Sequence, residues 1–422
     1  MIETRPKRNH ERAILIGLEQ EGVSKWDLRD SMEELAELAN SAGAEVVDTI
    51  TQKLQKPTAP YYIGKGKAEL IKDSLQDRQV TSVIFNDELS PAQGRNLENL
   101  LARKVLDRTQ LILDIFAQRA RSREGRLQIE LAQLQYLLPR LTGMWEHLSR
   151  QTGGIGMRGP GETQLEVDRR RVQERIARLE RELESVRKTR AVQRQGRKRH
   201  QWPVASVVGY TNAGKSTLLN LLTGADVVAE NRLFATLDPT TRSFTLPNKQ
   251  RVLLTDTVGF LRKLPHTLIE SFKATLEEVS EADLLIHVVD LSHARVDEQM
   301  EAVDKVTKEL DAYGKQTLIV FNKIDNLPDR ELAETYVKRF SGSVAISART
   351  GEGVNRLVQA LQDALSSWRL RLHFRIPTKE SALLAEIHRV GHVLELKYEG
   401  NDAVIVAHVP PHLEAKLSRY SQ

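Results

Sequence analysis

Short apolar runs alternate with helical patterns through the first part of the chain. The runs that predict β-strands are Ala13–Gly17, Ala44–Val47, Val80–Phe85 and Lys104–Leu106. The helical patterns between them are Met32–Ala42, Lys67–Leu75 and Ala92–Ala102. Strands that alternate with helices are typical of a parallel sheet covered by helices. Residues 1–116 are therefore predicted to form an α/β domain.

Two apolar seams follow, each with the spacing of one face of a long helix. The first seam consists of Leu127, Leu131, Leu134, Leu138, Leu141, Trp145 and Leu148. The second consists of Leu165, Val172, Ile176, Leu179, Leu183 and Val186, with Arg169 in one slot. Matching seams joined by a loop predict a long antiparallel helical hairpin over residues 117–200. The alternative is a pair of helices packed on the first domain; the heavily charged outer faces favour a projecting hairpin.

The loop between the seams is rich in glycine. Residues 153–161 read Gly-Gly-Ile-Gly-Met-Arg-Gly-Pro-Gly, with five glycines in nine positions. This backbone can adopt positive φ and approach a partner closely, although a flexible turn has the same composition. Arg150 and Arg158 suit a phosphate-rich surface. The run Arg187–Arg199 holds seven basic residues and no acid, which indicates a basic linker and favours RNA binding only weakly.

A second alternation of strands and helices covers residues 201–368, and a smaller unit follows over residues 369–422. In the smaller unit, Leu372–Ile376 predicts a strand and Glu380–Val390 a helix. Val393–Lys397 and Ala403–Val406 predict a β-hairpin, and Pro411–Tyr420 a short helix. The predicted fold class is a multidomain α/β protein in which the third domain has a doubly wound, mostly parallel sheet and the last is a small α+β domain.

Composition narrows the classes of protein. The 422 residues suffice for two or three domains, and 40% hydrophobic with 28% charged residues describe a globular protein. A net charge of +5 with local basic clusters leaves nucleic acid open as a partner. The absence of cysteine excludes disulfides, thiolate zinc sites and thiol catalysis. No apolar stretch is long enough to span a membrane, so we expect a cytoplasmic protein, with peripheral membrane contact left open.

The most specific motif opens the third domain. Gly209-Tyr-Thr-Asn-Ala-Gly-Lys-Ser216 follows the strand Val204–Val208 and precedes a helix that begins at Lys215. This is the context in which a P-loop binds phosphates through backbone N–H groups at a helix N-terminus. The Lys215 ammonium is expected at the β- and γ-phosphates, and the Ser216 hydroxyl is expected to ligate Mg²⁺.

Three further segments complete a guanine-nucleotide site. Asp256 ends the strand Leu253–Asp256, where a carboxylate can hold Mg²⁺ through water, and the N–H of Gly259 can contact the γ-phosphate. The Asp325 carboxylate in Asn322-Lys-Ile-Asp325 can accept hydrogen bonds from N1–H and the 2-amino group of guanine. Adenine lacks both donors, so this site selects GTP over ATP. Ser347-Ala348 is placed to support the base.

Two positions in the site are less conventional. In Phe234–Arg242 one threonine should close over Mg²⁺ in the triphosphate state, and the candidates are Thr236, Thr240 and Thr241. Phe260 follows Gly259 at the position where many small GTPases carry a glutamine that orients the attacking water. A phenyl ring cannot hydrogen-bond to water, so slow intrinsic hydrolysis is expected, with a partner that completes the catalytic site.

These motifs closely resemble the HflX GTPases, within the Obg-HflX group of translation-associated P-loop proteins, over nearly the whole chain. The most specific matches are residues 153–166 with Asp168-Arg-Arg170, Phe234–Asp238 and Asp256–Phe260. The resemblance implies that Thr236 is the Mg²⁺ ligand. It also implies a monomeric protein that binds the large (50S) ribosomal subunit, contacts ribosomal RNA through the glycine loop and splits stalled ribosomes, with the subunit as activator of hydrolysis.

The full expected site follows from the motifs and the resemblance together. Catalysis is assigned to Lys215 and Gly259, and Mg²⁺ binding to Ser216 and Thr236, with GTP as substrate. The residues expected to contact the nucleotide are Gly209, Tyr210, Thr211, Asn212, Ala213, Gly214, Lys215, Ser216, Thr217, Phe234, Ala235, Thr236, Leu237, Asp238, Asp256, Thr257, Val258, Gly259, Asn322, Lys323, Asp325, Ser347, Ala348 and Arg349.

Two other functions compete with this interpretation. The chain could be an RNA-binding or RNA-remodelling NTPase with a second nucleotide site in its N-terminal domain. Gly64-Lys-Gly-Lys67, before a predicted helix, is the only local support, and a solvated turn has the same sequence. A tRNA-modification GTPase or a regulator of a membrane protease is the third possibility. The former commonly carries a C-terminal cysteine, which this chain lacks, and no motif indicates the latter.

Overall fold

The computed structural model describes residues 11–22, 25–143, 160–199, 202–224, 233–234, 236–262, 276, 278–410 and 413–420. These residues form two compact units, and the boundary between the units falls between Ser185 and Val186, inside helix α7. Each unit is described by itself. Within the described ranges, every helix is too short or too polar to cross a membrane.

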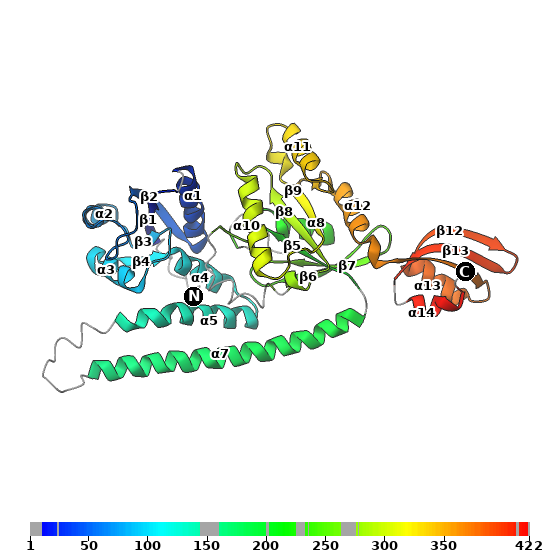
Figure 1. Ribbon diagram of the computed structural model, residues 1–422, viewed down its shortest axis with the longest axis horizontal. Helices are drawn as coiled ribbons and strands as arrows, with labels where there is room; N and C mark the ends of the chain where they lie inside the picture. Colours follow the sequence, from blue (N-terminus) through cyan, green and yellow to red (C-terminus); the bar gives the residue numbers. More distant parts are fainter. Residues whose placement is uncertain are drawn as a thin grey trace, which may run out of the picture. The chain divides into compact units, whose positions relative to one another are not determined.

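A four-stranded parallel sheet with the order β2-β1-β3-β4 forms the centre of the first unit (Figure 1). Its strands are β1 (Glu11–Glu19), β2 (Ala44–Lys53), β3 (Ser82–Phe85) and β4 (Lys104–Asp107). The helices are α1 (Lys25–Ala42), α2 (Lys65–Asp77), α3 (Pro91–Leu101) and α4 (Arg108–Arg119). The predicted parallel α/β sheet is thus confirmed. Helix α4 is absent from the predicted elements, although Asp107 caps its N-terminus and its apolar residues have helical spacing.

Two helices of the hairpin pack against each other in the first unit. They are α5 (Arg123–Leu137) and α7 (Pro160–Arg199). Leu127 and Leu131 of α5 form one buried cluster with Leu179 and Leu183 of α7. Arg123 pairs with Glu182, and Glu130 pairs with Arg175 at 2.7 Å, so the residue numbers run in opposite directions along the two helices. The antiparallel pairing is confirmed.

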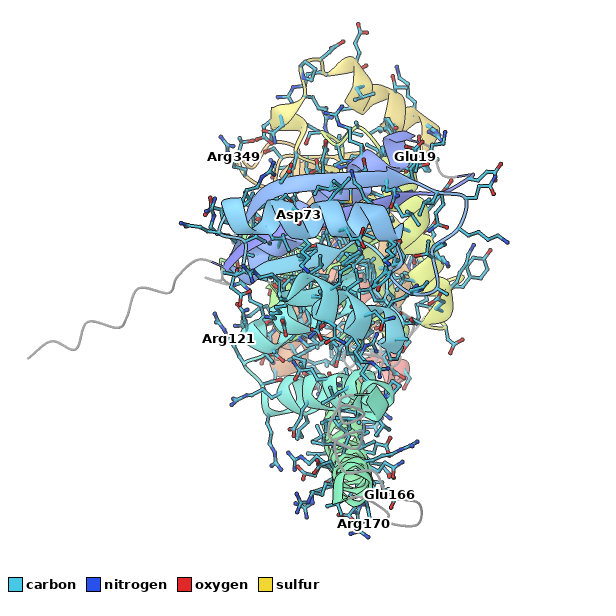
Figure 2. The ribbon with its side chains drawn as sticks, turned by 90° about the vertical axis from the view of Figure 1, so that its left-hand side faces the viewer. Glu19, Asp73, Arg121, Glu166, Arg170 and Arg349 are labelled. Atoms are coloured by element: carbon cyan, nitrogen blue, oxygen red, sulfur yellow. The ribbon has the colours of Figure 1, made fainter. Side chains whose placement is uncertain are left out.

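The first helix of the hairpin is shorter than its seam predicts. After Leu137 the chain changes to a 3₁₀-helix, η1 (Leu138–Gly143), instead of continuing as an α-helix. Pro139 explains why the α-helix ends at Leu137, because proline has no N–H to donate and its ring clashes with the preceding helical turn. Trp145, Leu148 and residues 153–159 of the glycine loop lie outside the described residues. Charged side chains project from α7, and Glu166 and Arg170 are examples (Figure 2).

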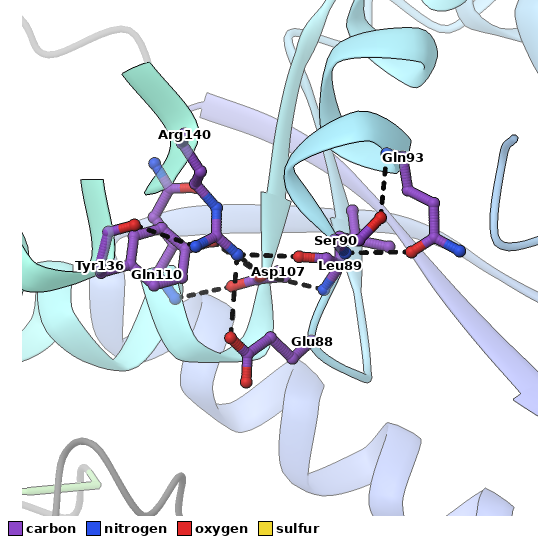
Figure 3. A network of polar contacts seen from close by, with 8 residues as sticks. All are labelled: Glu88, Leu89, Ser90, Gln93, Asp107, Gln110, Tyr136 and Arg140. Carbon is purple, nitrogen blue, oxygen red and sulfur yellow. Dashed lines mark hydrogen bonds and ion pairs between the residues drawn. The ribbon is translucent and has the colours of Figure 1, made fainter. Parts of the chain in front are cut away.

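A buried carboxylate holds the base of the hairpin to the sheet (Figure 3). Asp107, at the end of β4, is 1% exposed. It accepts hydrogen bonds from Leu89 N at 3.1 Å, Gln110 N at 2.9 Å, the Tyr136 hydroxyl at 2.7 Å and Arg140 at 3.4 Å. The Arg140 guanidinium also lies 3.5 Å from the centre of the Tyr136 ring. Helix α5 and η1 are therefore fixed to the N-terminal sheet by polar contacts as well as by packing.

The second unit contains a six-stranded sheet with the order β10-β9-β8-β5-β7-β6. All its neighbouring strands are parallel except β6 and β7. The strands are β5 (Val204–Gly209), β6 (Thr240–Thr245), β7 (Arg251–Asp256), β8 (Leu284–Asp290), β9 (Thr317–Asn322) and β10 (Val344–Ala345). The helical elements are α8 (Lys215–Thr223), α10 (Val296–Glu309), η2 (Ile324–Asn326), α11 (Glu331–Arg339), α12 (Val354–Ala364) and η3 (Ser366–Trp368). The doubly wound, mostly parallel sheet is confirmed.

The chain ends in a three-stranded antiparallel sheet with the order β11-β13-β12, as predicted for a small α+β domain. Its elements are β11 (Leu370–Pro377), α13 (Ser381–Val390), β12 (His392–Glu399), β13 (Asp402–Val409), α14 (Glu414–Leu417) and η5 (Ser418–Tyr420). We propose the predicted boundaries, 1–116, 117–200, 201–368 and 369–422, as the domain organisation.

Candidate nucleotide-binding site

The P-loop lies at the carboxyl edge of the six-stranded sheet, between β5 and α8. Gly214 has φ 96°, and a Cβ atom there would lie 2.3 Å from Asn322 Nδ2. Only glycine avoids that contact and adopts this φ without strain. Asn322 Nδ2 donates to Ala213 O at 2.8 Å, and Asn322 Oδ1 accepts from Ala348 N at 2.9 Å. Asn322 therefore joins the phosphate loop to the segment expected to support the base.

Lys215 is buried at the first position of α8. Its Nζ donates to the carbonyl oxygens of Gly209 at 3.2 Å and Tyr210 at 2.8 Å. Burial lowers the pKa of Lys215 to about 8, and the charge of Asp256 partly opposes that shift. A buried ammonium whose hydrogen bonds go to carbonyl oxygens favours an anionic ligand, because a phosphate adds negative charge next to it.

Three predicted Mg²⁺-related side chains meet at one point. The Ser216 hydroxyl donates to Asp256 Oδ2 at 2.6 Å, and the Thr236 hydroxyl donates to the same oxygen at 2.9 Å. The two hydroxyl oxygens are 2.8 Å apart. Thr240 and Thr241, the other candidates, are residues of β6 and make no such contact; Thr241 bonds to Thr255 at 3.0 Å. The geometry thus favours Thr236.

The same residues fit a hard divalent cation. Asp256 is fully buried, and among the described residues its Oδ1 has no hydrogen-bond partner. Burial raises the pKa of Asp256, while Lys215 and the two hydroxyl donors lower it. A cation close to this carboxylate would offset the cost of burying its charge. The donors are two hydroxyls and a carboxylate, oxygen ligands of the type that Mg²⁺ prefers. Groups of three or more His, Cys, Asp or Glu side chains that could hold a metal ion are absent from the described ranges.

Thr211, in the P-loop, is hydrogen-bonded to both the segment of Phe234 and the segment of Phe260. Its hydroxyl accepts from Phe234 N at 3.1 Å, and its N–H donates to Phe260 O at 2.8 Å. Phe260 N donates in turn to Gly209 O at 3.1 Å. A Cβ on Gly259 would lie 2.7 Å from Thr211 Cα, so glycine is needed for this close approach. The segment of Phe234 and the segment of Gly259-Phe260 are therefore both hydrogen-bonded to the backbone or side chains of the loop that precedes Lys215.

The Phe260 side chain is only 1% exposed and forms part of the buried core. The ring occupies a packed position, so it is not available to orient a water molecule. The nearby Tyr210 is also mostly buried, and its hydroxyl accepts a hydrogen bond from Arg262 N at 2.9 Å. The Tyr210 side chain thus supports the segment after Phe260, while its carbonyl contacts Lys215.

The predicted base-recognition segments are brought together at the ends of β9 and β10. Lys323 has φ 61°, and its Nζ lies 2.6 Å from Asp290 Oδ2 at the end of β8. Arg349 lies 4.0 Å from the Asp325 carboxylate. The buried Ser347 hydroxyl accepts from Thr350 N at 3.1 Å, which closes the loop after β10. Asp325 is thereby held at the same edge of the sheet as the P-loop.

The remaining predicted contacts differ in burial. Thr217, in α8, and Asp238, two residues after Thr236, are half-buried. Leu237, Thr257 and Val258 are buried, and the Thr257 hydroxyl donates to Val207 O at 2.6 Å, so these side chains support the segments from within. Asn212 is exposed at φ 60°. Ala235 lies outside the described residues.

Sequence reasoning overlooked one side chain of the site, Asp290, and one contact of the predicted residue Thr211. Asp290 pairs with Lys323, and its position at the polar end of a mostly apolar strand is the signal that could have identified it. The Thr211 hydroxyl bond to Phe234 N has no comparable signal, because it depends on the folded path of the chain between α8 and β6.

This P-loop, with the Asn-Lys-x-Asp segment on a doubly wound sheet, defines a P-loop GTPase. The family model described as "GTP-binding GTPase N-terminal" matches residues 29–117, and "GTP-binding GTPase Middle Region" matches residues 119–197. A third, described as "50S ribosome-binding GTPase", matches residues 204–323.

Full-length relatives extend this result. "GTPase HflX" of Caldanaerobacter subterraneus is 47% identical, over 98% of this chain and 94% of the relative. "GTPase HflX" of Escherichia coli is 47% identical, over 86% of this chain and 85% of the relative. A GDP complex of a GTP-binding protein from Sulfolobus solfataricus is 26% identical, with a TM-score of 0.45, and covers 85% of this chain and 99% of that chain. The chain belongs to the HflX family of GTPases, and it is a GTP hydrolase.

Proposed function

We propose that this GTPase binds GTP with Mg²⁺, associates with the large ribosomal subunit through its RNA, and dissociates stalled ribosomes in the cytoplasm as a monomer. One observation supports a mechanism in which two segments rearrange when the bound nucleotide changes. Thr236 and Gly259-Phe260, from two separate segments, are both fastened to the P-loop beside Lys215 and Asp256. A γ-phosphate at this point would interact with both segments. Their rearrangement would change the surface presented to a partner.

The residues present suit particular roles toward the substrate. Ser216 and Thr236 would hold Mg²⁺, with Asp256 acting through water, and the cation would neutralise charge on the phosphates. Lys215 would exchange its carbonyl partners for phosphate oxygens. The Gly259 N–H would donate to the γ-phosphate. Asp325 would accept hydrogen bonds from guanine, and Asn322 would keep the P-loop and the base-supporting loop in register.

Hydrolysis is proposed to depend on the ribosome. The buried Phe260 ring offers no group that could orient water, so an external group has to complete the transition state. Such a group raises phosphoryl-transfer rates by about 10³ to 10⁵. We expect large subunits to accelerate GTP hydrolysis by at least about 10³, as measured by phosphate release. Equal rates with and without large subunits would contradict the proposal.

The glycine loop of the hairpin is proposed as the part that reaches ribosomal RNA. The support for the hairpin is the density of exposed charge on α7. The family description "50S ribosome-binding GTPase", which matches residues 204–323, supports ribosome binding by the chain in general. The test is sedimentation of the protein with ribosomes in a sucrose gradient, with a non-hydrolysable GTP analogue bound. We compare the wild type with a variant that lacks residues 154–159. We expect the deletion to abolish co-sedimentation while GTP affinity stays at the wild-type value; unchanged co-sedimentation would refute the assignment.

The alternative of a second nucleotide site gains no support from the local geometry. Gly64 precedes α2, and its N–H already donates to Gln52 Oε1 at 2.9 Å. Lys65 pairs with Glu69 at 3.9 Å on the same helix. The turn therefore has the ordinary contacts of a helix start, and we do not propose this function.

A further inference from the structure

The two faces of the C-terminal sheet differ in what lies on them. Helices α13 and α14 lie on one side of it (Figure 1), where Phe374, Ile405 and Leu413 belong to a fully buried apolar cluster. Successive residues of a strand point to opposite faces, so the alternate residues of β11 and β13 belong to the other face. On that face Arg371, His373 and Arg375 of β11 are exposed, whereas Val404 and His408 of β13 are half-buried and Val406 is buried.

A bulge in β12 decides which of its residues join that face. Val393 is opposite Ala407, but Glu395 rather than Leu394 is opposite Val406, because the register shifts at this point. Val393 and Leu396 both pack against the apolar cluster as a result. His392, Glu395 and Lys397 are thereby directed to the open face.

The open face carries three histidines and three cationic side chains around a short apolar strip. The rows across β11, β13 and β12 follow from the pairing register of the strands. They are Arg371–His408–His392, His373–Val406–Glu395 and Arg375–Val404–Lys397. The next row, Pro377–Asp402–Glu399, is acidic. We call the first three rows the histidine face.

Charge is divided unevenly along this face. Arg375 pairs with Glu399 at 3.2 Å and with Asp402 at 3.0 Å, so both acids of this row form ion pairs within the sheet. The opposite end holds Arg371 and His392 on either side of His408 with no acid in their row. Burial lowers the pKa of His408, and the positive charges of His392, Arg371 and Arg369 lower it further. The cationic groups therefore repel one another, and a bound anion would relieve that repulsion.

We propose that the histidine face binds an RNA segment with unstacked bases. Such segments are recognised by open sheets whose flat side chains, including imidazole and guanidinium, stack on bases while cationic groups contact phosphates. The His392 and His408 rings, with centroids 6.4 Å apart and planes tilted by 57°, supply the ring surfaces, and the half-buried Val404 supplies an apolar contact between the edge strands. Arg371 and Lys397 supply phosphate contacts from the two edge strands. This inference deepens the proposed function by giving the C-terminal domain its own RNA contact, and it rests on that function only for the source of the RNA.

The test uses two full-length double variants with the same chemical change. Arg371→Ser/His392→Ser removes one guanidinium and one imidazole from the histidine face. His388→Ser/Arg389→Ser removes the same two groups from α13, on the other side of the sheet, where both side chains are exposed. Binding of a fluorescein-labelled 12-nucleotide single-stranded RNA to the GDP-bound proteins is followed by anisotropy. Photo-crosslinked peptides are identified by mass spectrometry.

We expect the histidine-face variant to bind this RNA about tenfold more weakly than the wild type, and the α13 variant to stay within about twofold. The dependence of log affinity on log salt should decrease by about one for the histidine-face variant only. Wild-type crosslinks should map to β11, β12 or β13.

Equal RNA affinity of the two variants, or crosslinks confined to the hairpin, would overturn the inference. Unchanged RNA binding combined with weaker co-sedimentation of the histidine-face variant with large subunits would indicate a ribosomal protein as the partner, and would overturn it as well. Neither result affects the proposed function, which fails separately if the wild type does not bind large subunits at all.

Discussion

Two buried aspartates, one in each unit, end a strand of a parallel sheet and differ in how they are satisfied. Asp107 ends β4 and is 1% exposed; Asp256 ends β7 and is fully buried. Both oxygens of Asp107 accept hydrogen bonds, including bonds from Tyr136 and Arg140. Asp256 accepts two hydroxyl bonds on one oxygen, while its other oxygen has no partner among the described residues.

The difference separates a carboxylate that stabilises the fold from one that is prepared for a ligand. A buried charge with a full set of donors, one of them cationic, fixes neighbouring elements in place. A buried charge with an unused oxygen costs stability until a cation or donor arrives. Position at the carboxyl end of a parallel strand is the same for both residues. The surrounding donors, and not the strand, decide whether the residue has a structural or a binding role.

The largest effect is expected from Asp107→Asn. The new amide group would face the Leu89 N–H, the Tyr136 hydroxyl and the Arg140 guanidinium, and Arg140 would keep Glu88, 3.8 Å away, as a carboxylate partner. Removing one partner of a buried pair costs about 3 to 5 kcal/mol in the free energy of unfolding, and the contact with Glu88 places the expected loss near the lower value. Urea denaturation, with hydrogen exchange to locate the loss, should show weaker protection in α5 and β4 and unchanged protection in the second unit. Loss of protection spread evenly over both units would contradict a local structural role.

The same substitution at Asp256 should have the opposite profile. Asp256→Asn should lower GTP hydrolysis stimulated by large subunits about 10² to 10³-fold, the loss typical of removing one group that stabilises transition-state charge. The nucleotide-free variant should be as stable as the wild type or more stable, because a buried charge is removed. Since the pKa of Asp256 is raised on folding, this advantage should be present at neutral pH and disappear toward about pH 4, where the unfolded carboxyl is also protonated. A stability loss like that of Asp107→Asn would contradict the assignment of Asp256 to ligand binding and of Asp107 to the fold.

The sequence predicts one member of this pair and not the other. Asp256 is identified because it stands in a motif, Asp256–Gly259, whose chemistry depends on neighbours in the chain. Asp107 receives its donors from Leu89, Tyr136 and Arg140, which are far apart in sequence. Its role appears only once β4, α5 and η1 are placed. Helix α4, which Asp107 caps, was overlooked for a related reason, since the capping signal lies inside an apolar run that also fits a strand.

The fold shows the same division between local and tertiary information. Periodicity suffices for the alternation of strands and helices, and for the seams of α5 and α7 that meet through Leu127 and Leu179. Periodicity alone extends the first seam past Pro139, where the backbone cannot continue the α-helix. It also cannot place the β12 bulge, which determines the face of Glu395.

The loss of stability at low pH should begin in the second unit. His287 of β8 is 3% exposed, and burial, followed by the charge of Lys215, lowers its pKa from 6.5 to about 4. A histidine with a depressed folded pKa contributes stability above pH 6.5 that is lost as the pH falls toward about 4. The loss is about 3 kcal/mol at pH 4.

The described part of the first unit contains no histidine, so it lacks this source of acid sensitivity. Hydrogen exchange at pH 6.5 and 4.5 should show earlier opening around β8, and His287→Gln should reduce the pH dependence there. His293→Gln, at an exposed position, serves as the control. An unaltered pH dependence in the His287 variant would assign the acid sensitivity to the carboxylates instead.

The smallest effect is expected from Tyr136→Phe, which removes one donor from Asp107 and leaves the others. The phenyl ring keeps its contact with the Arg140 guanidinium, now 3.5 Å from the ring centre, so only the 2.7 Å hydroxyl bond is lost. A hydrogen bond to a charged group contributes about 1.5 to 3 kcal/mol, and the remaining donors place the expected loss near the lower value. Tyr398→Phe, at a tyrosine that is 65% exposed, should change stability by less than about 0.5 kcal/mol. Urea denaturation of both variants measures the difference. If Tyr136→Phe cost as much as Asp107→Asn, the hydroxyl rather than the whole set of donors would be what makes Asp107 structural.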